Sequence, residues 1–145
     1  MRIAQVAPLF ERVPPVTYGG TERVVAYLTD ALVELGHDVT LFASGDSLTR
    51  GRLVPAAPRS LRLDTTCRDT MAPQIRELEL VSRTAHRFDV IHFHTGFLHL
   101  PLARHLVPPS VTTMHGRLHF GEIAPMMGDF ADAPFVSISN HQRQP

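Results

Sequence analysis

The sequence predicts a doubly wound α/β domain with a mostly parallel sheet, a Rossmann-like class of fold. Short apolar runs alternate along the chain with segments of helical spacing, and the first run begins almost at residue 1. A long loop then leads through two adjacent glycines into an amphipathic segment. A chain of 145 residues has room for one such domain. A chain of that size buries roughly 70 % of its unfolded surface.

The first three elements are a strand, a loop and a helix. Residues 3–7 form a short, mainly apolar run that ends at Pro8, as in a strand buried on both faces of a parallel sheet. Residues 8–20 form an irregular loop, and loops of this length are usually functional. A helix is predicted over residues 21–35, with Gly36 as its stop. Its expected apolar face is Val24, Val25, Leu28, Ala31, Leu32 and Leu35.

The remaining elements continue the alternation. A strand over residues 39–43 completes a right-handed crossover with the first strand. Residues 48–71 are hard to assign, and only a short strand near 61–63 is suggested. Beyond them we expect a helix at 74–87, a strand at 89–94, a short helix at 98–106, and strands at 111–114 and 135–138.

Composition excludes several classes of protein. The 14 basic residues balance the 14 acidic residues, which gives no electrostatic basis for binding nucleic acid. Every basic residue is Arg, so the Lys of a Walker loop is missing. Cys67 is the only cysteine, which excludes an internal disulfide and indicates a reducing, cytoplasmic location. No run resembles a signal peptide or approaches the ~20 apolar residues of a membrane span.

A glycine pair precedes the first helix. In the run Tyr18-Gly19-Gly20-Thr21-Glu22, free backbone N–H groups meet the positive end of the helix dipole, which favours an anion such as a diphosphate. Alternatively, the glycines only permit a turn. The G-x-G-x-x-G pattern of nicotinamide cofactor sites is absent.

Histidines end two predicted strands. His115, followed by Gly116, lies at the carboxyl end of a strand, the edge at which open α/β sheets bind ligands. Its neutral imidazole suits a sugar hydroxyl, although it can also simply cap loop carbonyls. His92 and His94 share a strand face, as a metal pair would, but no matching set of further ligands follows. We therefore expect His92 to be buried and His94 to face the cleft.

Two further polar residues are weaker candidates. Asp46 follows the second strand, where Rossmann folds often hold a ribose, although a solvated turn carboxylate is the simpler reading. Arg143 faces either an anionic ligand or a partner domain, or belongs to a frayed end.

Six segments, in order, resemble family 4 glycosyltransferases, retaining enzymes in which two Rossmann-like domains face each other in the GT-B arrangement. The matching residues are 2–8, 18–25, 36–47, 88–94, 112–118 and 136–139. The resemblance implies that residues 1–145 form the N-terminal, acceptor-side domain. The C-terminal domain, which would bind the nucleotide sugar, is not among these residues.

The resemblance also implies roles for individual residues. Gly19, Gly20 and Thr21 would bind the donor diphosphate, and His115 would be the catalytic residue that contacts the transferred sugar. The cleft toward the acceptor would be lined by His94, Tyr18, Gly116 and Arg143. The chemistry needs no metal and no cofactor, because the nucleotide sugar is a co-substrate and the leaving diphosphate is stabilised electrostatically.

Without a C-terminal partner domain we expect negligible transferase activity, and we expect the open cleft to favour self-association. Two other functions stay open. One is a stand-alone Rossmann-like module that binds a sugar or anion without catalysis. The other is a His-rich, metal-dependent hydrolase.

Overall fold

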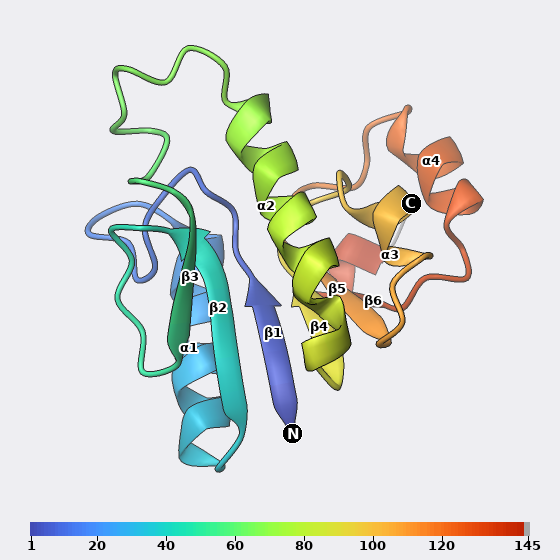
Figure 1. Ribbon diagram of the computed structural model, residues 1–145. Helices are drawn as coiled ribbons and strands as arrows, with labels where there is room; N and C mark the ends of the chain where they lie inside the picture. The colour runs from blue at the N-terminus through green and yellow to red at the C-terminus, as the bar shows by residue number, and fades with distance from the viewer. Residues whose placement is uncertain (144–145) are drawn as a thin grey trace.

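A computed structural model describes residues 1–143 and contains one sheet of six parallel strands in the order β3-β2-β1-β4-β5-β6 (Figure 1). The strands are β1 (Arg2–Val6), β2 (Asp38–Ser44), β3 (Arg52–Ala57), β4 (Val90–Phe93), β5 (Ser110–Met114) and β6 (Phe135–Ser137). The helices are α1 (Gly20–Glu34), α2 (Met71–Thr84), α3 (Leu100–Ala103) and α4 (Ile123–Asp129), with 3-10 turns η1 (Ala85–Arg87) and η2 (His141–Arg143). This strand order is that of the doubly wound Rossmann-like fold, so the predicted fold class is confirmed.

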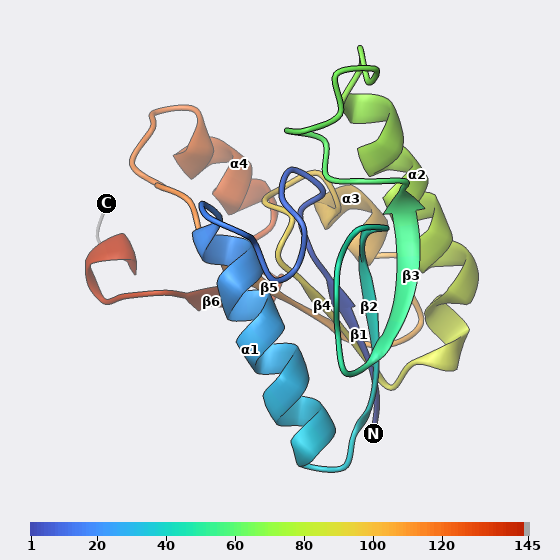
Figure 2. The ribbon, with the colours of Figure 1, turned by 90° about the vertical axis from the view of Figure 1, so that its left-hand side faces the viewer.

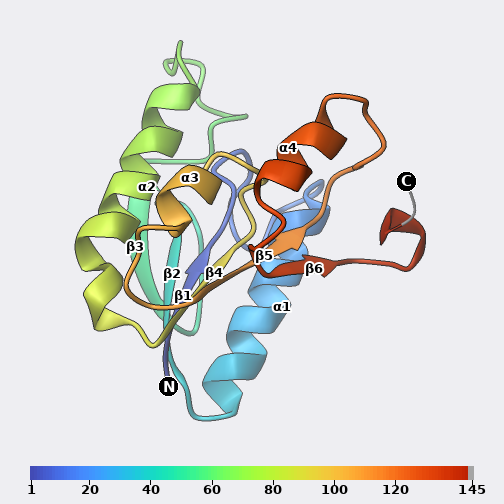
Figure 3. The same ribbon diagram turned by 90° about the vertical axis from the view of Figure 1, so that its right-hand side faces the viewer.

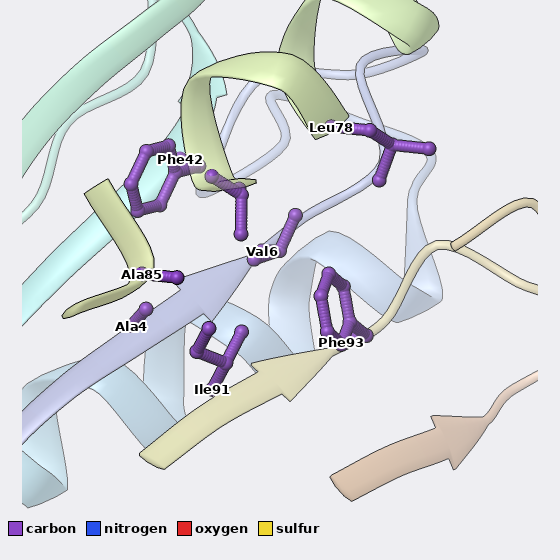
Figure 4. Close-up of a cluster of buried hydrophobic side chains, with 8 residues drawn as sticks. Ala4, Val6, Phe42, Leu78, Ala85, Ile91 and Phe93 are labelled. Carbon is purple, nitrogen blue, oxygen red and sulfur yellow. The ribbon is translucent and has the colours of Figure 1, made fainter. Parts of the chain in front are cut away.

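Helices cover both faces of the sheet. Figures 2 and 3 show α1 on one face and α2 with α3 on the other. Under α2, the apolar core joins Ala4 and Val6 of β1 to Phe42 of β2 and to Ile91 and Phe93 of β4 (Figure 4). Because side chains alternate along a strand, the residues between these face α1.

The predicted apolar faces of the two long helices needed correction. In α1 the buried residues are Glu22, Val25, Ala26 and Thr29, whereas Val24 and Leu35 are exposed. In α2 the buried residues are Glu77, Leu78 and Val81, and Ile75 is exposed. Both buried faces keep helical spacing, but each admits an acidic residue that an apolar count overlooks.

The predicted strand near residues 61–63 is wrong. The third strand is β3, and residues 61–63 form a turn whose Leu61 packs on Leu9 and Ala56. β3 lies at the edge of the sheet and contains Pro55. An edge strand tolerates the missing N–H of proline, whereas a central strand does not. The sequence pattern therefore did not predict a strand around Pro55.

Two of the later helices also differ from expectation. α3 is shorter than the predicted segment 98–106, and α4 was not predicted. No residue of α4 is fully buried, and its seven residues include Pro125 and Gly128, which are poor helix formers. Among the helices of residues 1–143, none combines the length and apolar composition that crossing a membrane requires.

Candidate functional site

The candidate site lies where the chain reverses its direction of winding. β1 continues into α1 on one face of the sheet, while its neighbour β4 continues toward α3 on the other face (Figure 3). The two outgoing loops separate, and ligands of open α/β sheets bind in the crevice that this leaves. A cavity of about 250 Å³ opens there. It is lined by Pro8, Leu9, Phe10, Thr21, Gln74, Glu77, Leu78, His94, Thr95, Gly96, Leu98, His115 and Gly116.

Two histidines and a glutamine form a hydrogen-bonded row across three strands. Nε2 of His94 lies 2.8 Å from Oε1 of Gln5, and Nδ1 of His94 lies 2.9 Å from Nε2 of His115. His94 and Gln5 are buried, and His115 is half-buried. The register of β1, β4 and β5 places all three on the face that α1 also covers.

The row fixes which ring nitrogens carry protons. Because Oε1 of Gln5 accepts, Nε2 of His94 donates, and Nδ1 of His94 then accepts from Nε2 of His115. The neutral His115 is left with a lone pair on Nδ1. Burial lowers the pKa of His115, and burial together with His92 and His115 lowers the pKa of His94 to about 2. Both rings are therefore neutral at physiological pH.

Two other histidines lie beside this row. His92 bonds to Thr113, and His99 bonds to Thr112 and stacks on Phe93. Burial lowers the pKa of both His92 and His99 to about 4. At His92 the electrostatic interaction with His115 contributes to this lowering of the pKa. In residues 1–143 no three His, Cys, Asp or Glu side chains are grouped to hold a metal ion.

The N-terminus of α1 reaches the cavity through Thr21. Gly19 and Gly20 do not line it. Gly19 has φ of 135°, and a Cβ there would lie 2.8 Å from Cβ of Pro15, so the backbone itself requires glycine. That Cβ would also lie 3.0 Å from Oε2 of Glu22. The Glu22 carboxyl is buried and its pKa is raised by burial, so an acid stands beside the dipole end that was expected to attract a diphosphate.

The four residues predicted to line the acceptor cleft separate into two groups. His94 and Gly116 line the cavity. Tyr18 is 74 % exposed, outside the cavity, and the guanidinium of Arg62 lies 5.4 Å from its ring centre. Arg143 lies on η2, donates from Nε to the Ser137 hydroxyl at 2.5 Å, and borders a separate hollow beyond β5.

Asp46 has a structural partner. Its carboxylate accepts from the backbone N–H and the hydroxyl of Ser60 at 3.0 and 3.1 Å. It thus joins the turn after β2 to the loop after β3 and is not available to a ribose.

Sequence reasoning missed two residues of the site, Gln5 behind His94 and Glu77 in the cavity wall. Gln5 lies inside an apolar strand, and a lone amide there was an available signal. Glu77 is 1 % exposed, and its Oε1 has no hydrogen-bond partner within residues 1–143. Burial raises its pKa well above the usual value. The signal was that Glu77 lies four residues before the apolar Val81, a spacing that places both side chains on the same face of a helix.

Comparisons with known proteins identify the family of this chain. The model of Glycosyltransferase Family 4 matches residues 18–139. Among solved structures, the chain is similar to the crystal structure of AviGT4, a glycosyltransferase involved in avilamycin A biosynthesis, with 28 % identity and a TM-score of 0.61. The similarity covers 94 % of this chain and 41 % of that chain. No curated protein matches the sequence. The matched residues include the cavity histidines and the N-terminus of α1, and the chain belongs to Glycosyltransferase Family 4.

Proposed function

We propose that this domain is the acceptor-side half of a glycosyltransferase that moves a sugar from a nucleotide-sugar donor to an acceptor with retention of configuration. The observation that carries the proposal is one cavity at the winding reversal, lined by Thr21 at the start of α1, by His94 and by His115 with Gly116. A site of this kind joins neutral hydrogen-bonding groups to a helix N-terminus, as a sugar with a diphosphate requires.

His115 is the proposed catalytic residue. Its Nδ1 lone pair accepts from a sugar hydroxyl, while its other nitrogen is held by His94. Gln5 in turn orients His94, so a buried row positions the imidazole without giving it charge. A neutral, preoriented acceptor is what holds a sugar ring in place while charge develops toward the leaving diphosphate.

In our proposal, a second domain makes most of the contacts to the diphosphate. Within this chain, the N–H groups of Gly19, Gly20 and Thr21 are the proposed donors, but of these residues Thr21 alone lines the cavity among the described residues, and the buried Glu22 carboxyl opposes a second negative charge. No arginine of residues 1–143 lines the cavity. A second, nucleotide-binding domain in the GT-B arrangement therefore supplies the main grip, and residues 1–145 alone have negligible transferase activity. We assign no metal to the reaction.

The test compares the 145-residue chain with the same chain joined to a nucleotide-binding GT-B domain. UDP- and GDP-sugars are supplied, and released nucleotide and transferred sugar are measured. We expect turnover only in the joined form. In that form His115→Ala lowers kcat/KM by about 10²-fold or more, through loss of an interaction with the transferred sugar.

His86→Ala is the matched control, because His86 is exposed on η1 and lies outside the cavity. Turnover should not change in that variant. Unchanged turnover in His115→Ala would remove the assigned role.

A non-catalytic sugar-binding module is the second candidate. It is favoured by one observation, that the cavity offers neutral hydrogen-bonding groups but, among the described residues, no arginine to hold a diphosphate. In that case the isolated chain binds sugars, and no added nucleotide-binding domain produces transfer.

A further inference from the structure

Glu77 gives the cavity an acid without a partner. It lies on α2, is 1 % exposed and lines the cavity, and its Oε1 has no hydrogen-bond partner in the described part of the chain. Leaving a buried carboxyl unpaired costs on the order of 1–3 kcal/mol or more. A merely structural position on α2 would be better filled by an apolar residue. The burial of Glu77 and the missing partner of its Oε1 indicate a side chain that pairs with a bound ligand.

The charges around Glu77 define what that ligand can be. The titratable side chains that line the cavity are Glu77, His94 and His115. Both histidines are held neutral, since burial lowers their pKa. Among residues 1–143 no arginine lines the cavity, and the neighbouring Arg76 donates to the carbonyl of Ala56 at 2.6 Å. The one group that can carry charge at neutral pH is therefore an acid.

We infer that Glu77 is a specificity-determining residue that makes the cavity prefer a sugar or polyol bearing an amino group over its neutral counterpart, and reject one bearing a carboxylate or phosphate. An ammonium group supplies both the missing hydrogen-bond donor and the opposite charge. A hydroxyl supplies the donor alone, and an anion would be buried in a poorly solvated space without a cation to balance its charge. The inference rests on the proposed function, because it takes a sugar as the occupant.

The protonation state of Glu77 agrees with this preference. Burial raises the pKa of its carboxyl, which favours the protonated, neutral acid in the empty cavity. An entering ammonium group stabilises the carboxylate, and the proton on Glu77 leaves to solvent. A neutral sugar leaves the acid protonated. Proton release thus distinguishes the two ligands independently of affinity.

The experiment titrates the 145-residue chain with glucosamine, glucose and glucuronate, which share a ring and differ in one substituent. Binding is followed by NMR shifts of residues that line the cavity. We expect glucosamine to bind at least tenfold more tightly than glucuronate, with glucose between them. In Glu77→Gln, which keeps the shape and removes the acid, the three affinities should agree within about threefold, a difference worth less than about 1 kcal/mol.

Glu79→Gln is the matched control. It makes the same chemical change on the same helix, but Glu79 is exposed and does not line the cavity. Its order of affinities should equal that of the unchanged chain.

Calorimetry of the unchanged chain needs no variant. At about pH 6, in two buffers with different ionisation enthalpies, glucosamine binding should release protons and glucose binding should release none. The inference about Glu77 is overturned if glucosamine releases no proton, or if the three sugars bind alike in the unchanged chain. It also fails if Glu77→Gln keeps the preference. If none of the three sugars binds any form of the chain, the sugar-binding cavity of the proposed function falls as well.

Discussion

One face of the sheet carries two regions of opposite character. Below α1, on β1 and β2, it is apolar and closes around Val25 and Ala26 of the helix. On β4 and β5, the same face carries His92, His94 and Thr113, in register with Gln5 of β1. The two regions are in contact at β1, since Ala7 belongs to the first and Gln5 to the second.

The difference separates residues that stabilise the domain from residues that we propose bind a ligand. An apolar side chain removed from water stabilises the fold without needing a partner. A buried imidazole or amide needs each hydrogen bond satisfied, and its net contribution to stability is small. A polar region on a sheet face that could have been apolar therefore adds less stability, and we attribute its presence to function. The three predictions below test this division, from the largest expected effect to the smallest.

Leu41→Ala tests the apolar region. Leu41 is fully buried on β2 in the cluster under α1. Its truncation should lower the free energy of unfolding by about 2–5 kcal/mol, because the surrounding core cannot collapse around the lost volume. Denaturant unfolding measures the change. Leu48→Ala, at an exposed leucine, is the control and should cost less than about 0.5 kcal/mol. A small loss at Leu41 would mean that α1 is not held by this cluster.

Acid should lower the stability of the domain through the buried histidines that follow β4. The folded pKa values of His94 and His99 are depressed to about 2 and about 4, whereas the unfolded value is about 6.5. Below that value the unfolded chain binds protons that the folded chain excludes, so stability falls as pH falls from about 6.5 to about 4. Each such group adds up to about 1.4 kcal/mol per pH unit to the slope.

Denaturant unfolding at several pH values measures this slope. His99→Gln should remove one histidine's share of it, and the exposed His86→Gln should leave it unchanged. A stability that does not change between about pH 6.5 and pH 4.5 would contradict the exclusion of protons from these rings.

Gln5→Leu tests the polar region where it meets the apolar one. Nε2 of Gln5 is buried without a partner within residues 1–143, so loss of the amide removes an unpaired donor along with the bond to His94. We expect the free energy of unfolding to change by less than about 1 kcal/mol. Sugar affinity should fall about threefold to tenfold, because His94 no longer holds His115 in one tautomer.

Imidazole ¹⁵N NMR of His94 reports the tautomer directly. Leu41→Ala serves as the opposite control, since it should destabilise the domain and leave that tautomer unchanged. If Gln5→Leu destabilises as much as Leu41→Ala, the division between the two regions is wrong.

Much of the fold could be predicted from the sequence. The apolar runs around β1, β2, β4 and β5 were found because strands buried on both faces are nearly continuous apolar segments. The strand near 61–63 was wrong because β3 contains Pro55, a residue that only an edge position allows. The faces of α1 and α2 were misplaced because Glu22 and Glu77, both acidic, occupy buried positions.

The candidate site could be predicted in part. The rule that ligands bind at the carboxyl edge of the sheet singled out His94, His115 and Gly116, which now line one cavity with Thr21. Tyr18 and Arg143, chosen through the resemblance, lie outside it. The roles of Gly19, Gly20 and His115 in donor binding and catalysis, and the cytoplasmic location, stay predictions.

By itself the sequence determined most of the alternation of strands and helices, the parallel sheet and the edge at which we propose that a ligand binds, because these follow from periodicity and from the handedness of crossovers. Only the tertiary structure decided which polar groups meet there. Gln5 and His94 are 89 residues apart and share a bond, because β1 and β4 became neighbours. Oε1 of Glu77 has no hydrogen-bond partner within residues 1–143, and this too depends on which residues of other segments surround it. A sequence pattern records only the spacing along one segment.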